Sequence, residues 1–140
     1  MKTHHLDTSI VIPYISGLYG TDEQRNNENN KKAVAFIKNC RAHVKISIVV
    51  VAEVLSKAAN PEIMADYLDK EFPAPLPLEI SIARRWARLQ TRSGRTMGDN
   101  DAWVAALAYA KDAVVVGNDD DAFLDRPGLE YKNFARQGSP

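Results

Sequence analysis

GDNDAWVAALA, residues 98–108, opens on acidic residues and continues as an alanine-rich apolar run. Acids suit the first turn of a helix, because the unpaired N–H groups and the helix dipole favour negative charge there. We therefore expect a helix over about residues 100–111, with Asp99 or Asn100 as its N-cap and Asp101 in its first turn. Taken alone, these acids are explained equally well as capping groups of a buried helix. The positions of the other acids decide between capping and chemistry.

Strand-like runs flank this helix in both directions along the chain. Residues 113–117 form an uninterrupted apolar run that is typical of a buried parallel strand, and residues 45–51 are nearly continuous in apolar residues. Two shorter strands are predicted over residues 3–7 and 129–134. Helices are predicted over residues 33–40, 52–59, 61–72 and 79–93. We therefore expect an α/β protein, a three-layer α/β/α sandwich around a mainly parallel sheet of four or five strands.

The composition is that of one globular domain over residues 1–140, with residues 135–140 as a frayed tail. The chain is 45% hydrophobic and 26% charged, and no apolar run approaches the ~20 residues that span a bilayer. There is no signal-peptide pattern, and the single Cys40 excludes an internal disulfide and a multi-cysteine zinc site, so we expect a cytoplasmic protein. The 18 basic and 18 acidic residues balance, which argues against bulk attraction to nucleic acid.

Acidic side chains fall at one edge of the predicted sheet. Asp7 ends the first strand and residues 119–121 follow the strand at 113–117, while Glu53 and Asp101 lie at predicted helix starts just beyond that edge. Each has a simpler explanation, as a helix cap, an exposed charge or a solvated turn. Two carboxylates about 4 Å apart repel by about 4 kcal/mol at an effective dielectric of 20. Four such groups together therefore need raised pKa values or a cation.

Carboxylate oxygens without cysteine or a suitably spaced histidine pair favour Mg²⁺ or Mn²⁺ over Zn²⁺. A cation of this kind is the usual apparatus for hydrolysing phosphodiester bonds, because it generates hydroxide and neutralises charge on the phosphate. The helix at 79–93 carries a basic stripe of Arg84, Arg88 and Arg92, of the kind that follows phosphates. A solvated face paired with surface acids explains this stripe equally well.

The same residues resemble the motifs of the PIN-domain ribonucleases, and among them the VapC-like toxins of type II toxin–antitoxin systems. The first three motifs are matched by Leu6-Asp7-Thr8-Ser9, Val51-Ala52-Glu53-Val54 and Asp101-Ala102-Trp103-Val104-Ala105-Ala106. The fourth, Val116 through Phe123, departs from the family pattern, because Gly117 stands where Thr or Ser is common and Ala122 precedes Phe123. Its acid is therefore Asp119 or, as the second choice, Asp121.

The resemblance implies a Mg²⁺- or Mn²⁺-dependent endoribonuclease that acts on tRNA, rRNA or mRNA, forms a homodimer and is inhibited by a cognate antitoxin. In this interpretation the catalytic and metal-binding acids are Asp7, Glu53, Asp101 and Asp119, the supporting residues are Ser9, Asp99, Asn118 and Asp121, and RNA is contacted by Arg84, Arg88 and Arg92. The alternative is a non-catalytic PIN-like module that binds RNA or protein, against which the full set of acids weighs. A phosphatase or receiver domain is excluded, since Asp7-Thr8-Ser9 lacks a second acid two residues on.

Overall fold

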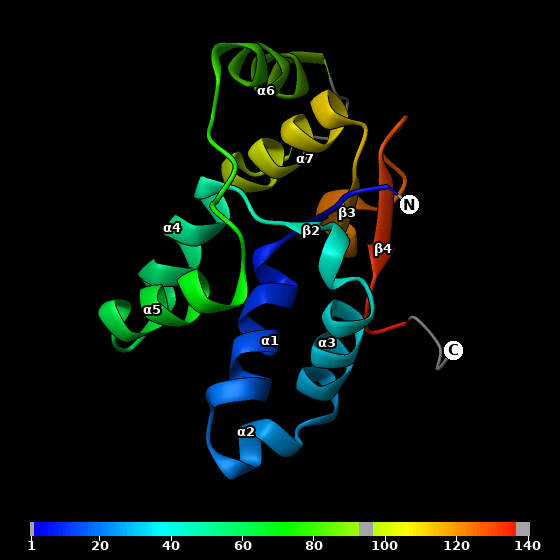
Figure 1. Ribbon diagram of the computed structural model, residues 1–140. Helices are drawn as coiled ribbons and strands as arrows, with labels where there is room; N and C mark the ends of the chain where they lie inside the picture. The colour runs from blue at the N-terminus through cyan, green and yellow to red at the C-terminus, as the bar shows by residue number, and fades with distance from the viewer. Residues whose placement is uncertain (1, 93–96, 137–140) are drawn as a thin grey trace.

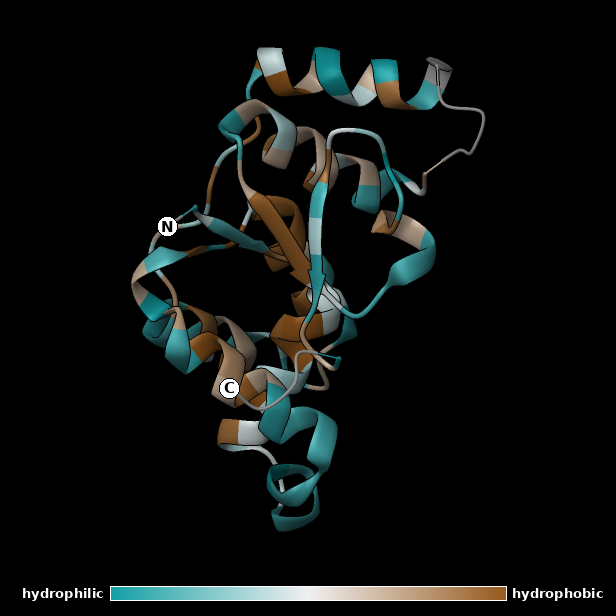
Figure 2. Ribbon diagram, turned by 90° about the vertical axis from the view of Figure 1, so that its right-hand side faces the viewer, coloured by the Kyte–Doolittle hydropathy of each residue, from teal (hydrophilic) through white to brown (hydrophobic). Residues whose placement is uncertain are grey.

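The computed structural model describes residues 2–92 and 97–136. Its strands form one parallel sheet in the order β2-β1-β3-β4. Figures 1 and 2 show helices on both sides of this sheet, which confirms the predicted α/β/α sandwich. The elements are β1 (His4–Leu6), α1 (Thr8–Tyr19), α2 (Asp22–Asn26), α3 (Glu28–Asn39), η1 (Arg41–His43), β2 (Val44–Lys45), α4 (Ile48–Lys57), α5 (Pro61–Glu71), α6 (Ile80–Arg92), α7 (Asp99–Lys111), β3 (Val114–Gly117), α8 (Asp120–Phe123) and β4 (Glu130–Asn133).

The connections that leave the two central strands diverge. The chain passes from β1 to β2 at one edge of the sheet and from β3 to β4 at the other. In an open parallel sheet, ligand sites form outside the carboxyl ends of the strands at such a switch point. Asp7 follows β1 and Asn118 follows β3, so both residues lie at this switch point.

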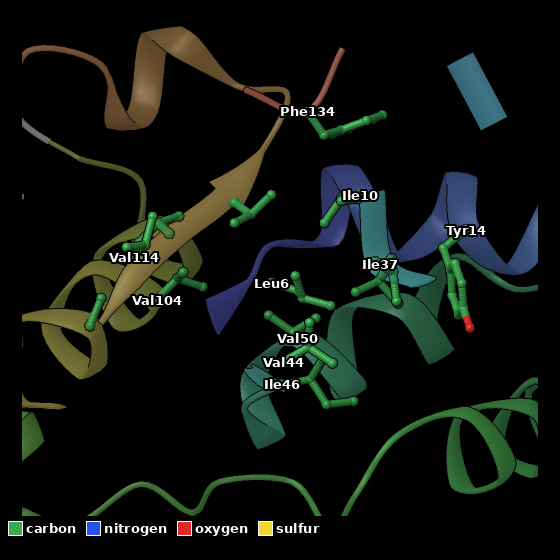
Figure 3. Close-up of a cluster of buried hydrophobic side chains, with 14 of the residues drawn as sticks. Leu6, Ile10, Tyr14, Ile37, Val44, Ile46, Val50, Val104, Val114 and Phe134 are labelled. Carbon is green, nitrogen blue, oxygen red and sulfur yellow. The ribbon is translucent and has the colours of Figure 1, made fainter. Parts of the chain in front are cut away.

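The core is built on β1 and β3, whose side chains are buried along the whole length of each strand. Figure 3 shows Leu6 of β1 among Ile10 of α1, Ile37 of α3 and Val50 of α4. Burying one such aliphatic side chain stabilises the fold by about 1.5–3 kcal/mol. On the other side, α7 contributes small buried residues to this core that allow a close approach to the sheet; they are Ala102, Ala105 and Ala108.

Helix α6 lies outside this sandwich and packs against α7 (Figure 2). Trp86 stacks on Trp103 with their ring centroids 5.3 Å apart, and the Trp86 Nε1 donates to the Asp99 carbonyl at 3.1 Å. Among the described residues, no helix is both long and apolar enough to cross a membrane.

The predicted strand over residues 45–51 is too long: beyond Lys45 only Ser47 still forms a bridge, to Leu76, and residues 48–51 are helical. Strand β2 ends at Lys45, and α4 begins at Ile48 because Ser47 caps it, with the Ser47 Oγ accepting a hydrogen bond from the Val50 N–H at 3.2 Å. A short run of apolar β-branched residues fits a buried helix as well as a strand, and periodicity alone does not separate the two. Glu53 therefore lies in the second turn of α4 rather than at its start.

Two smaller predictions also need correction. The N-cap of α7 is Gly98 rather than Asp99 or Asn100, although Asp101 does lie in the first turn. Of the tail predicted to fray, residues 135–136 are held in place: the Ala135 N–H donates to the Asn133 side chain at 2.9 Å, and Arg136 pairs with Asp120. Residues 137–140 lie outside the described residues.

Replacing Ser47 by alanine leaves the buried Val50 N–H without its partner, so we expect Ser47→Ala to lower the free energy of unfolding by about 1–2 kcal/mol. Urea unfolding followed by circular dichroism measures the change. The control is Ser56→Ala in the same helix, because the Ser56 side chain is exposed and its hydroxyl donates to the Glu53 carbonyl at 2.7 Å. Equal losses in the two variants would contradict a special role of the Ser47 cap.

Candidate functional site

Asp7 is both a helix cap and an acid at the edge of the sheet, the two roles that the sequence left open. It caps α1, and its Oδ2 accepts hydrogen bonds from the Ser9 backbone N–H at 3.1 Å and the Ser9 hydroxyl at 2.6 Å. The residue is only 4% exposed. Burial raises the pKa of Asp7 above its usual value, although the Ser9 hydrogen bonds act in the opposite direction. A buried carboxylate at a strand end is therefore held in one orientation by the first turn of α1.

The Ser9 hydroxyl also ties α1 to the end of β3. Its Oγ accepts a hydrogen bond from the Asn118 backbone N–H at 2.7 Å. Gly117 makes this approach possible, because a Cβ at that position would lie 2.6 Å from the Ser9 Oγ and 3.0 Å from the Asp7 Cβ. The departure from the family pattern at residue 117 thus has a steric reason in this chain.

Asp101 is a second carboxyl group with a raised pKa at this edge of the sheet. Burial raises its pKa to about 6, and the charges of Asp7, Asp119 and Glu53 contribute in that order. The positive charge of Arg126 opposes them. Asp101 therefore feels the charges of acids from three other parts of the chain.

Glu53 reaches the same place from α4. Its Oε2 accepts a hydrogen bond from the Asn100 side-chain amide at 2.7 Å. Burial raises the pKa of Glu53, but Asn100 and the nearby Thr8 hydroxyl outweigh it, and the pKa lies below its usual value. The Thr8 hydroxyl is buried and lies near the Glu53 carboxylate, and it meets no full hydrogen-bond geometry with any partner in the described part of the chain.

The three consecutive aspartates after β3 have different surroundings. Asp119 caps α8, with its Oδ1 accepting from the Ala122 N–H at 3.3 Å, and it is the member of the three whose charge acts on Asp101. Asp120 instead accepts hydrogen bonds from Arg136, Tyr131 and Asn133, and these lower its pKa to about 2. Asp121 is exposed in the first turn of α8. This arrangement favours Asp119 over Asp121 as the fourth acid.

The remaining predicted residues are spread over a wider area. Asn118 receives an amide hydrogen bond from Asn133 at 2.8 Å, and Asp99 is exposed in the first turn of α7. Arg84 and Arg88 are exposed on α6, whereas the side chain of Arg92 lies outside the described residues. The basic stripe therefore belongs to the outer helix and not to the sheet edge that carries the acids.

Sequence reasoning missed two residues near these acids. Asn100 was considered only as a helix cap, yet it bonds Glu53. Arg126 is buried, donates from its Nε to the Ala122 carbonyl at 2.8 Å and acts electrostatically on Asp101. Asn100 could have been noticed as the neighbour of Asp101, whereas nothing in the local sequence marks Arg126.

The donor set fits a hard divalent cation in its chemistry. The acids present only oxygen ligands, and the pKa values of Asp7 and Asp101 are raised mainly by burial, which a bound cation would offset by favouring the ionised carboxylates. Within residues 2–92 and 97–136, however, no three His, Cys, Asp or Glu side chains stand close enough to form a ready-made metal site. A cation would therefore have to draw these side chains together.

Adding a methyl group at residue 117 should displace the hydroxyl that orients Asp7. We expect Gly117→Ala to lower the free energy of unfolding by about 1–3 kcal/mol, as overpacking does. Gly117→Ala is compared with the double variant Ser9→Ala/Gly117→Ala, in which the Oγ that the new Cβ would meet at 2.6 Å is absent. Thermal unfolding of the two single variants and the double variant gives the coupling; strictly additive losses would show that the Ser9 contact is not the cause.

Asp101→Asn should stabilise the metal-free protein at pH 7. The folded state binds the Asp101 proton more tightly than the unfolded state, so the ionised carboxylate destabilises the fold above pH about 6, and this effect disappears as the pH falls toward 4. After allowance for partial exposure, we expect a gain of about 1–2 kcal/mol at pH 7 and little at pH 4. Unfolding in EDTA at both pH values tests this, with the exposed Asp66→Asn as control; a loss of stability at pH 7 would contradict it.

Comparison with known proteins agrees with this geometry. The PIN domain family matches residues 5–129. Ribonuclease VapC5 of Mycobacterium tuberculosis is 32% identical over 124 residues, which cover 86% of each chain.

Solved structures share the fold at lower identity. The DNA-bound VapBC structure from Salmonella typhimurium aligns with a TM-score of 0.74 at 20% identity, over 96% of this chain and 99% of that one. FitAcB from Neisseria gonorrhoeae aligns with a TM-score of 0.72 at 18% identity, over 96% and 99%. From the match over residues 5–129 and the similarity to VapC5, the chain belongs to the PIN-domain family.

Proposed function

We propose that this protein is a metal-dependent endoribonuclease that cleaves RNA phosphodiester bonds and is the toxin of a type II toxin–antitoxin pair. The observation that carries the proposal is the raised pKa of Asp101, which arises where acids from α1, α4 and the end of β3 meet at a switch point of the sheet. Family membership and the similarity to a ribonuclease support hydrolysis of RNA phosphodiester bonds as the reaction at this acidic site. All of residues 1–140 belong to this one domain.

Asp7, Glu53, Asp101 and Asp119 would hold Mg²⁺ or Mn²⁺. When bound, such a cation supplies an activated water and neutralises charge on the phosphate. Asp7 is the most firmly oriented of the four acids, because Ser9 bonds it through both its N–H and its hydroxyl. Asp101 has to be ionised to act as a ligand, so protons compete with the cation below pH about 6. Ser9 and Asn118 support this arrangement, and Asp99 and Asp121 lie around it.

The partners follow from the same family. The RNA substrate would be a tRNA, rRNA or mRNA, and its phosphates would lie along Arg84, Arg88 and Arg92 of α6. The structural relatives from Salmonella typhimurium and Rickettsia felis are VapBC assemblies, which supports a cognate antitoxin as a protein partner. We also propose a homodimer and a cytoplasmic location.

RNA cleavage by the purified protein tests the proposal. We expect cleavage of total cellular RNA with Mn²⁺ or Mg²⁺ and none in EDTA, and loss of at least about 100-fold of the rate in Asp7→Asn and Asp101→Asn. Both variants should remain folded by circular dichroism, and Asp66→Asn on α5 should cleave at the wild-type rate.

Metal titration separates the proposed nuclease from a non-catalytic module. A nuclease of this kind melts at a higher temperature as Mn²⁺ is added, because the cation binds the folded state, and this increase should be absent in Asp101→Asn. Cleavage that survives both substitutions and excess EDTA would refute the metal-dependent mechanism. A folded wild-type protein that neither cleaves nor responds to Mn²⁺ would favour the binding module.

A further inference from the structure

Glu53 differs from the other acids of the site in how it is held. It lies in the second turn of α4, whereas Asp7 is the N-cap of α1 and Asp101 lies in the first turn of α7. Its carboxylate bonds Asn100, which is 47 residues away in the sequence, at 2.7 Å. Because a carboxylate only accepts hydrogen bonds, the Asn100 amide presents its nitrogen to Glu53.

Asn100 connects two helices at the point where both contribute an acid. It precedes Asp101 directly in the first turn of α7, so one short segment of backbone carries both the amide and the neighbouring carboxylate. A bond from this segment to Glu53 links α4 to α7 at the site. It also restricts rotation of the Glu53 side chain, which has more rotatable bonds than an aspartate.

An amide is well suited to this task. It donates a hydrogen bond to Glu53 without adding charge to a site that already contains four acids, and a carboxylate at residue 100 would repel Glu53 instead. Lysine or arginine would neutralise Glu53 and compete with a cation. Groups that orient the ligands of a metal through a second layer of hydrogen bonds commonly change metal affinity by 10–100-fold when removed.

We propose that Asn100 is a positioning residue that orients Glu53 toward the cation-binding acids. This inference rests on the proposed nuclease function and assigns Asn100 a role in it that does not require contact with RNA. Asn100 acts through Glu53 and not as a helix cap, since Gly98 occupies the N-cap position of α7.

Mn²⁺ binding by calorimetry and RNA cleavage kinetics test the role of Asn100. We expect Asn100→Ala to weaken Mn²⁺ binding about tenfold and to lower kcat at subsaturating metal, with the KM for RNA changed less than about twofold. Asn100→Gln keeps the donor and should recover part of the affinity. The matched control is Asn26→Ala, which removes an exposed amide that bonds the Asp22 carbonyl at 2.8 Å within α2.

A double-mutant cycle with Glu53→Ala decides whether Asn100 acts through Glu53. In the Glu53→Ala background, Asn100→Ala should have no further effect on Mn²⁺ affinity, and melting of the metal-free proteins should give a coupling of the same pair. Full additivity, or unchanged Mn²⁺ affinity in Asn100→Ala, would overturn the inference while leaving the nuclease proposal intact. A wild-type protein that neither binds Mn²⁺ nor cleaves RNA would overturn both.

Discussion

Parallel pairing of β1 with β3 is the constraint on which the rest of the structure depends. Both strands are buried, and their register continues past the end of β1, where the Asp7 N–H donates to the Val116 carbonyl at 2.8 Å. The chain ends of the two strands are therefore fixed next to each other before any side chain of the site is considered. The Ser9 hydroxyl completes the junction, and Gly117 leaves the space that this hydroxyl occupies.

A junction of this kind permits an unfavourable arrangement of charge. Asp7 is buried and Asp101 lies in the field of three other acids, so both carboxylates are harder to ionise than in water. The apolar packing of β1, β3 and the helices around them is what holds these groups together. Stability given up at a binding site in this way is recovered when a ligand of opposite charge arrives.

Much of the fold could be predicted because its determinants are local. The apolar run of β3, the acids that follow β1 and β3 and the first turn around Asp101 can all be recognised in short segments of sequence. The start of α4 was not, because a single serine cap decides between strand and helix for a run that suits both.

The sequence-based prediction of the site did not include its long-range contacts. The bond from Asn100 to Glu53 and the approach of Arg126 to Asp101 join segments that only the folded chain brings together. The separate roles of Asp119 and Asp120 likewise depend on Tyr131 and Asn133 of β4 and on Arg136 just after it, which donate to Asp120 in the folded chain. Adjacent aspartates of identical chemistry cannot be distinguished without that information.

Residues 48–51 are helical in the folded protein, but their apolar, β-branched sequence has a consequence for the chain before it folds. Residues 46–52 are apolar and β-branched apart from Ser47 and Ala52, and they contain no charge and no proline. Such a segment is of the type that assembles between chains into intermolecular β-structure when it is exposed. Lys45 and Glu53 flank it, and charged residues in these positions oppose that assembly. Glu53 therefore serves solubility during synthesis as well as the acidic site of the finished fold.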